Sequence, residues 1–164
     1  MQLDELRSRL LTARDQRDEI VEEYKFFEGS TLVLSTNIPG VNKLPDGICE
    51  LFSSGCKAVK DRLNVSQVIT GEDAAGLYMV CNCEEMSETA KRIAVWIEEN
   101  LPAGRLLDID IYKQGEQLGR REIGLPARKC IVCGDPAVDC IRSKKHDVHI
   151  ITNQVEKMLQ RTHS

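Results

Sequence analysis

Apolar residues along the chain follow a helical period in some stretches and a strand period in others, and these changes mark out the elements. Near the N-terminus, leucines recur at positions 3, 6, 10 and 11, which predicts a helix from Leu3 toward Tyr24. Asp46 and Ser87 precede two further amphipathic stretches and are expected to cap them. The stripes at helical spacing that follow predict helices from Ile48 to Leu63, from Ser87 to Leu101 and from Val148 to Leu159.

Shorter runs with β-branched or alternating apolar residues predict the strands. The first run, from Thr31 to Thr36, stops at the turn Asn37-Ile-Pro-Gly40. The polar loop Gly71–Gly76 separates two further runs, which are expected to pair as a hairpin. The remaining predicted strands are Val65–Thr70, Leu77–Cys83, the strand-like run Ala103–Tyr112 and, after a turn at Gln114–Glu116, a return strand around Leu118–Ile123.

The central order of these elements is strand, helix, strand, strand, helix, strand. This βαββαβ unit favours an α+β fold with a ferredoxin-like antiparallel sheet, two helices on one face, and additional N-terminal and C-terminal helices. The chain has 164 residues, of which 41% are hydrophobic, enough for one domain with a substantial core. We therefore expect a single domain over residues 1–164.

Charge is distributed unevenly along the chain. Residues 1–103 carry 11 basic and 18 acidic side chains, a net of −7, whereas residues 104–146 carry 9 basic and 6 acidic ones, a net of +3. A polyanionic ligand or an acidic protein partner would be drawn to this second segment. Nucleic acid is disfavoured as a partner, because three Phe, three Tyr and one Trp offer few stacking platforms on an acidic chain.

The sequence also bears on compartment and redox state. No apolar run approaches the roughly 20 residues that span a bilayer, and the N-terminus lacks the apolar core of a signal peptide, so a cytoplasmic protein without membrane contact is expected. The seven cysteines are then expected to be reduced thiols or metal ligands. Cys49 and Cys56 lie seven residues apart near an apolar helix face and are interpreted as core residues.

Two carboxylates stand out in the strand Ala103–Tyr112. Apolar Leu107, Ile109 and Ile111 alternate with Asp108 and Asp110, so both acids project from the same side. Like charges at this spacing repel unless a cation lies between them. The pair indicates a divalent metal used for phosphate chemistry, and the alternative is a solvated strand face that carries two acids by chance.

A second group of candidate ligands follows the predicted sheet. It has one Cys-x-x-Cys pair at zinc-knuckle spacing, and the full set comprises Cys130, Cys133, Cys140 and His146. A structural Zn²⁺ bound there would fix the segment that leads to the last helix. The alternatives are small core thiols with a surface histidine, or a histidine that contributes to phosphate binding.

The strand with the two acids resembles a known signature. The segment Gly104-Arg105-Leu-Leu-Asp108-Ile-Asp110 is similar to the Arg-x-x-Asp-x-Asp motif of the hydroxymethyl-dihydropterin pyrophosphokinases, where it follows the second helix of a βαββαβ unit. In that family the two aspartates hold Mg²⁺ on ATP. The pterin-site residues of the family are missing here, so the likeness concerns fold and metal use only.

A broader resemblance extends over nearly the whole chain. The segments that carry it occur in this order: Leu10-Leu-Thr-Ala-Arg14-Asp15-Gln-Arg17, Pro39-Gly40-Val-Asn-Lys43, Gly104–Asp110, Arg120-Arg121, and Leu125-Pro-Ala-Arg128-Lys129-Cys130-Ile-Val-Cys133 with Cys140 and His146. Together these segments resemble those of the bacterial apo-citrate lyase phosphoribosyl-dephospho-CoA transferases, also called citrate lyase holo-acyl-carrier-protein synthases. The resemblance implies transfer of a prosthetic group from 2′-(5″-triphosphoribosyl)-3′-dephospho-CoA to a serine of the citrate lyase acyl carrier subunit, with release of pyrophosphate.

The candidate residues match the needs of that chemistry. Displacement of pyrophosphate requires cations around a triphosphate, and Asp108 and Asp110 would hold Mg²⁺ there. Arg105 is assigned a catalytic role beside them. The other candidates for phosphate or carrier contacts are Arg120, Arg121, Arg14, Arg17, Lys43 and the backbone N–H groups at Gly40. Their alternative roles are solvated arginines, an ordinary turn, and local ion pairs with Asp15, Asp18 and Glu19.

Two other functions remain open on the sequence. One is a non-enzymatic, zinc-containing adaptor that holds a carrier protein through the basic segment 104–146. The other is a small-molecule pyrophosphokinase on the same frame, which would release AMP from ATP. Metal-dependent release of pyrophosphate in the presence of the apo-carrier subunit would separate the transferase from the adaptor, and release of AMP from ATP would indicate the pyrophosphokinase.

Overall fold

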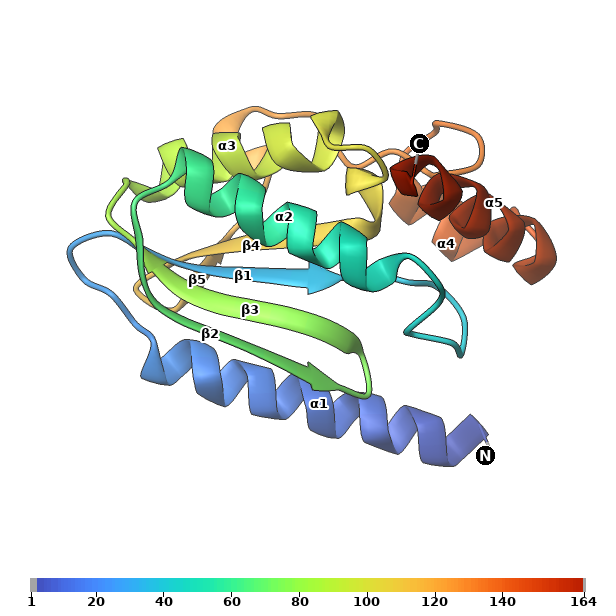
Figure 1. The fold of residues 1–164 in the computed structure, drawn as a ribbon, viewed down its shortest axis with the longest axis horizontal. Helices are drawn as coiled ribbons and strands as arrows, with labels where there is room; N and C mark the ends of the chain where they lie inside the picture. Colours follow the sequence, from blue (N-terminus) through green and yellow to red (C-terminus); the bar gives the residue numbers. More distant parts are fainter. Residues whose placement is uncertain (1–2, 164) are drawn as a thin grey trace.

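The computed structural model describes residues 3–163, and its centre is a five-stranded antiparallel sheet with helices on both faces (Figure 1). The strand order across the sheet is β2-β3-β1-β4-β5, so the first strand of the chain lies in the middle. The bounds of the strands are β1 (Ser30–Thr36), β2 (Val65–Asp73), β3 (Gly76–Cys83), β4 (Leu107–Lys113) and β5 (Glu116–Leu118). An α+β fold with an antiparallel sheet was predicted, and both are confirmed.

The main core lies between one face of the sheet and two helices, α2 (Ile48–Arg62) and α3 (Ser87–Asn100). Strand alternation places Leu32 and Leu34 of β1 on this face, opposite Ile111 and Ile109 of β4. All four side chains are fully buried. The apolar stripes predicted for the two helices face this core, which explains why the amphipathic pattern identified them.

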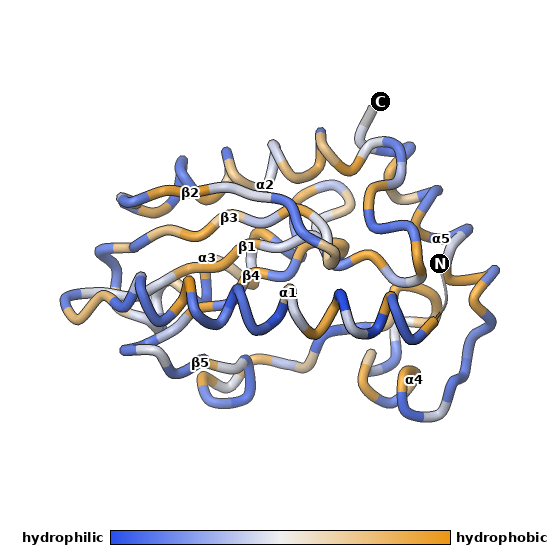
Figure 2. Tube along the Cα trace, turned by 90° about the horizontal axis from the view of Figure 1, so that it is seen from below, coloured by the Kyte–Doolittle hydropathy of each residue, from blue (hydrophilic) through white to orange (hydrophobic). Residues whose placement is uncertain are grey.

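Among the described residues, α1 (Leu3–Glu23) is the helix that covers the other face of the sheet (Figure 1). Val21 of α1 packs on Val33 and Val80 in a small second cluster. Only Ala13 and Val21 of this helix are buried, and its trace in Figure 2 is mostly hydrophilic where it crosses the strands. The predicted N-terminal helix is confirmed, and it adds a third layer to the fold.

A polar clamp holds α1 to the sheet. The guanidinium of Arg17 donates two hydrogen bonds to the carboxylate of Asp73 at the end of β2, at 2.6 and 2.8 Å. It donates a third to Ser35 Oγ at 2.9 Å, and it lies over the ring of Tyr78. Both Arg17 and Asp73 are largely buried. Through Asp73 of β2, Ser35 of β1 and Tyr78 of β3, the arginine ties the helix to three strands.

The C-terminal part forms a separate cap at one end of the sheet. It consists of the short helix α4 (Ala137–Ser143), which was not predicted, followed by α5 (Val148–Gln160) and the 3-10 helix η3 (Arg161–His163). Val155 and Leu159 of α5 join the main core, as the predicted stripe requires. Figure 1 shows both helices beyond the end of β1.

Several predicted boundaries are wrong by a few residues, each for a local reason. Gly47, not Asp46, is the N-cap of α2, with a left-handed φ of 88° that glycine adopts without strain. Met86 takes the N-cap position of α3, and Ser87 is the first residue of the helix. The hairpin of β2 and β3 runs further than predicted, and only positions 74 and 75 remain as its loop.

Larger differences concern the segments on either side of β4. Residues Gly104–Leu106 form a 3-10 helix, η1, in place of the predicted start of the strand. Gly104 packs so closely on the carbonyl oxygens of Ile97 and Glu98 that a Cβ would lie 2.8 Å from each, so a larger residue does not fit there. After β5 the chain leaves the sheet, and Arg121–Ile123 form the 3-10 helix η2 in place of a strand. Arg120 turns there to reach α3. Cys56 is buried as predicted, whereas Cys49 is exposed, so its interpretation as a core residue is wrong.

No helix within residues 3–163 is both long enough and apolar enough to cross a bilayer.

We expect Arg17→Ala to lower the free energy of unfolding by about 2 kcal/mol, because it leaves the largely buried carboxylate of Asp73 without its charged partner. Arg14→Ala, an exposed arginine on the same helix, should change it by no more than about 0.5 kcal/mol. Urea denaturation followed by circular dichroism measures both. Equal effects of the two substitutions would show that the clamp does not hold α1.

Candidate active site

Asp108 and Asp110 project from β4 toward the face of the sheet that α1 covers, opposite to the buried Leu107, Ile109 and Ile111. Alternation along the strand places them on one side, as predicted. Both are partly buried. They therefore lie in the space between the sheet and α1 rather than on an open surface.

That space is a cleft of about 990 Å³. Its walls come from α1, from the ends of β1 and β4, and from the loop after β1. The two aspartates share it with four cationic side chains, Arg7, Arg14, Arg17 and Lys43. Three of the candidates for phosphate contact, Arg14, Arg17 and Lys43, are thus brought together with the acidic pair although they are far from it in sequence.

The electrostatic state of the pair is asymmetric. Burial and then the neighbouring charge of Asp108 raise the pKa of Asp110 to about 6. Asp110 accepts a hydrogen bond from Gln117 Nε2 at 2.7 Å, whereas Asp108 accepts an ion-paired contact from Arg128 Nη1 at 2.9 Å. Burial and the charge of Asp110 also raise the pKa of Tyr112 to about 12. Burial and the neighbouring acid thus disfavour the ionised form of Asp110.

Arg128 fixes this corner of the site. Besides Asp108, its guanidinium donates to the carbonyl oxygens of Leu107 at 2.6 Å and Arg105 at 3.2 Å. It thereby joins the segment before the cysteine group to the start of β4. The sequence analysis assigned no role to Arg128, although it lies within the Leu125–Cys133 motif. The one feature that could have indicated a role was its position two residues before Cys130.

The backbone between the two aspartates is held from the core side. β5 pairs only with Ile111–Lys113, so Ile109 has no strand partner on that edge. Two charged side chains of α3 take the place of a strand: Glu98 Oε1 accepts from the Ile109 N–H at 2.7 Å, and Lys91 Nζ donates to the Ile109 carbonyl at 3.0 Å. Their exposed fractions are 2% and 5%. The sequence did not identify Lys91 and Glu98 as site residues, because the helix that contains them has an ordinary amphipathic pattern.

Arg120 belongs to the same arrangement. Its guanidinium pairs with the Glu98 carboxylate and, at 3.1 Å, with Glu99. It does not line the cleft with the aspartates. Arg121 is exposed in η2, outside the cleft as well.

The other candidate residues are distributed around the end of β1. Lys43 Nζ donates to the Ile38 carbonyl at 2.6 Å, and burial lowers its pKa. Gly40 is exposed in a turn with a positive φ of 85° and does not line the cleft. Arg105 faces away from the cleft, donates to the Lys129 carbonyl at 2.6 Å, and lines a second cavity.

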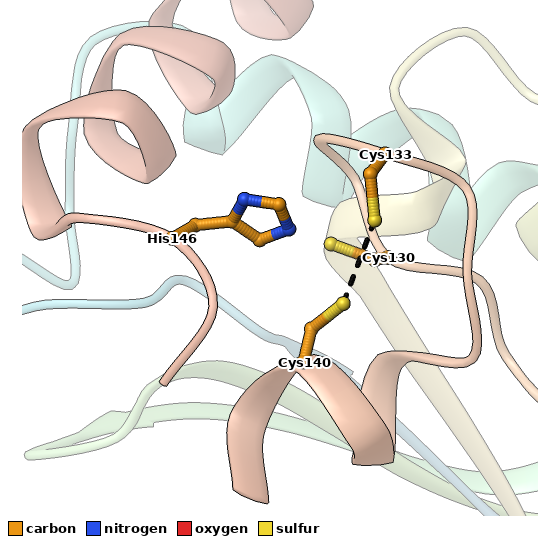
Figure 3. A group of neighbouring side chains, drawn as sticks. All are labelled: Cys130, Cys133, Cys140 and His146. Atoms are coloured by element: carbon orange, nitrogen blue, oxygen red, sulfur yellow. Dashed lines mark hydrogen bonds between the residues drawn. The ribbon is translucent and has the colours of Figure 1, made fainter. Parts of the chain in front are cut away.

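The cysteine group converges as its spacing predicted. One ligand atom from each of Cys130, Cys133, Cys140 and His146 lies within 4.8 Å of the others (Figure 3). The Sγ atoms of Cys133 and Cys140 are 3.5 Å apart. Burial opposes ionisation of Cys130, but backbone N–H groups of Cys133 and Val132 bring its pKa below the usual value. This set can hold a metal ion such as zinc.

The comparisons with known proteins decide the family. A model of the apo-citrate lyase phosphoribosyl-dephospho-CoA transferase family matches residues 6–162, nearly the whole chain. The chain belongs to this family. The resemblance inferred from the motifs is thereby confirmed, and it favours the transferase over the adaptor and the pyrophosphokinase.

Similar proteins support the same family. An apo-citrate lyase phosphoribosyl-dephospho-CoA transferase of Escherichia coli is 30% identical over 158 residues, which cover 92% of this chain and 86% of that protein. A probable transferase of the same name from Streptococcus pyogenes is 29% identical over 93% of this chain and 84% of its own. Protein CitXG of Haemophilus influenzae is 29% identical over 92% of this chain, which covers 34% of that longer protein. The chain is accordingly a transferase that installs phosphoribosyl-dephospho-CoA on apo-citrate lyase.

The raised pKa of Asp110 predicts a pH-dependent stability in the absence of divalent metal. Below about pH 4 the group is protonated in both the folded and the unfolded state. Between about pH 4 and the folded pKa near 6 the unfolded chain ionises first, so rising pH destabilises the fold. We expect Asp110→Asn to gain up to about 2 kcal/mol over the wild type between pH 4 and pH 7.

Denaturant titrations at several pH values measure this difference. Asp15→Asn, which removes an exposed carboxylate on α1, serves as the control and should show no such trend. A difference between the Asp110→Asn and wild-type proteins that stays constant over the range would contradict the assigned protonation state.

Proposed function

We propose that the cleft beneath α1 binds the triphosphate of 2′-(5″-triphosphoribosyl)-3′-dephospho-CoA and directs it to a serine of the citrate lyase acyl carrier subunit. The observation that carries the proposal is the convergence of two carboxylates and several cations in one cleft. In the reaction, the serine Oγ bonds to the α-phosphorus and the bond from that phosphorus to pyrophosphate breaks. The serine proton passes to solvent or to the released pyrophosphate.

Asp108 and Asp110 fit a hard divalent cation such as Mg²⁺. Both offer only oxygen ligands from one side of a rigid strand, and the raised pKa of Asp110 reports negative charge that a bound cation would relieve. A cation bound there would neutralise the triphosphate and stabilise the leaving pyrophosphate. Arg128 holds Asp108 in place, and Lys91 and Glu98 fix the backbone between the two acids.

The cationic residues of the cleft are assigned two kinds of role. Arg14 and Lys43 are proposed to contact phosphate, since both line the cleft, Arg14 from α1 and Lys43 from the segment after β1. Arg17 also lines it, but its contacts with Asp73 and Ser35 give it a structural role as well. Arg120 is proposed to act as a positioning residue through Glu98. Arg121 and Gly40 stay predictions for contacts outside the cleft.

We also propose that β1 to β4, with α2 and α3, form a ferredoxin-like unit. The support is that β1 lies between β3 and β4, so that a strand separates β1 from β2, as in a split βαβ arrangement. α1, β5 and the cap of α4 and α5 are then additions to that unit.

Zinc is proposed as the ion of the cysteine group. Three thiolates and one imidazole are a ligand set that Zn²⁺ prefers, and four ligands close its tetrahedral shell. A second observation supports it: the Nε2 atom of His146 is buried without a hydrogen-bond partner among the described residues, and Figure 3 shows the ring directed at the cysteines. Coordination of a metal ion would give this nitrogen the partner that it lacks among the described residues.

We expect Asp108→Asn and Asp110→Asn each to reduce transfer at least about 100-fold, because each removes a carboxylate from the proposed cation site. Transfer of the prosthetic group to the apo-carrier subunit, with pyrophosphate release, is the measurement, made with and without Mg²⁺. The Asp15→Asn control should retain activity. Full activity of either β4 variant, or transfer independent of divalent metal, would contradict the assignment.

The zinc proposal predicts about one equivalent of Zn²⁺ in reduced protein purified without chelator. Cys130→Ser and Cys133→Ser should lose it, whereas Cys49→Ser, at an exposed cysteine outside the group, should keep it. Elemental analysis measures the metal content directly. Metal-free wild-type protein, or an unchanged zinc content in both Cys130→Ser and Cys133→Ser, would favour the alternative that these cysteines are thiols packed in the core.

A further inference from the structure

A second cavity, of about 530 Å³, lies between the end of β1 and the C-terminal cap. Its walls are mainly aliphatic and come from η1, from the segment around the cysteine group and from α4 and α5. The apolar side chains that line it are Leu106, Ile131, Val132, Ile141, Val148 and Ile151. Ile141 and Val148 are largely exposed, which leaves an apolar rim at the surface.

The polar lining of this cavity includes two cations, Arg105 and Lys144, one acid, Asp147, and three members of the cysteine group, Cys130, Cys140 and His146. Burial, followed by the nearby charge of Arg128, lowers the pKa of Arg105 to about 10. Burial thus disfavours the charged guanidinium of Arg105, and an anionic group beside it would offset that cost. The cavity combines apolar walls with a site for negative charge.

The cavity adjoins the cleft that contains the aspartates. Asn37 lines both the cleft and the cavity. Of the next two residues, Ile38 lines the cleft and Pro39 lines the cavity. Arg105 and Asp108 are three residues apart, so at most about 11 Å of chain separates their backbones. Arg128 contacts both of these residues. A ligand of modest length can occupy the two spaces at once.

We infer that this cavity binds the dephospho-CoA portion of the donor while the triphosphate lies in the cleft, an inference that rests on the proposed function. In the donor, a single ribose joins the triphosphate to the dephospho-CoA portion, which matches the adjacency of the two spaces. The dephospho-CoA portion carries an adenine ring and a pantetheine arm for the apolar walls and a diphosphate for Arg105 and Lys144. The volume lies in the range of small-molecule pockets.

An apolar helix of the carrier protein is the other conceivable occupant. Helices bind in elongated open grooves through anchors one or two turns apart. A cavity of this volume with a half-buried arginine fits a compact anionic ligand better. If the cavity binds the donor, a variant of its rim changes the binding of the donor. If it binds the carrier protein, the same variant changes the binding of the carrier.

Dephospho-CoA itself is the probe, titrated into the reduced protein as purified without chelator, with no added Mg²⁺ or carrier, and followed by calorimetry. Val148→Glu and Ile141→Glu place a negative charge on the rim, and each should raise Kd about tenfold or more, because the charge opposes the diphosphate. Each has a matched control on its own helix that does not line the cavity, Ile150→Glu and Val138→Glu. The rim residues are 68% and 77% exposed and the controls 48% and 54%, so none of the four is needed for folding.

In the transfer assay the rim variants should raise KM for the donor and leave kcat and the carrier's KM unchanged, because the lost contact acts equally in the ground state and the transition state. Absence of dephospho-CoA binding to the wild type, or equal losses in rim and control variants, would overturn the inference. A raised KM for the carrier alone would assign the cavity to the carrier protein instead.

The same measurements separate this inference from the proposed function. Asp110→Asn should bind dephospho-CoA as the wild type does, because the probe lacks the triphosphate. If Asp110→Asn retains transfer while Val148→Glu loses the probe, the assignment of the cleft fails and the assignment of the cavity stands. If Asp110→Asn loses transfer and the probe does not bind, the reverse holds.

Discussion

The geometry of the active site depends on how α3 completes the edge of β4. A central strand of a sheet is held by hydrogen bonds on both sides, but beside Ile109 the chain provides a lysine and a glutamate in place of a strand. Burying two such groups is costly unless each is hydrogen-bonded, and here the backbone and Arg120 satisfy them. Aspartates on either side of Ile109 are thereby held on a rigid peptide rather than at a frayed edge.

Arg128 connects that strand to the rest of the site. It bonds the carbonyls at the start of β4 and the carboxylate of Asp108, and it stands two residues before the first cysteine of the metal-binding group. Arg105, which donates to the carbonyl of Lys129, joins the same two segments. The cysteine group and the acidic pair look independent in the sequence, but these two arginines connect the segments that contain them.

Much of the fold could be predicted from residue patterns, and the remainder fails for identifiable reasons. The stripes of α2, α3 and α5 and the alternation of β1 and β4 were informative because they face one large core. α4 was missed because seven residues with one buried side chain leave no periodic signal. Of the candidate site, spacing alone predicted that Asp108 and Asp110 lie on one side of β4 and that the cysteine group converges. Lys91, Glu98 and Arg128 were not, because their roles arise from contacts between segments distant in the chain.

The helix α1, which covers the candidate active site, contributes few side chains to the core. α1 contributes two buried side chains and is fastened near its C-terminal half by Arg17, while its N-terminal turns border the cleft. Segments with few apolar contacts open locally at a small fraction of the free energy needed to unfold the whole domain. Under the proposed function, a carrier protein has to bring a serine into this cleft. The turns of α1 before the Arg17 clamp are the part of the cleft wall that can open without breaking the contacts with Asp73 and Ser35 or disturbing the sheet.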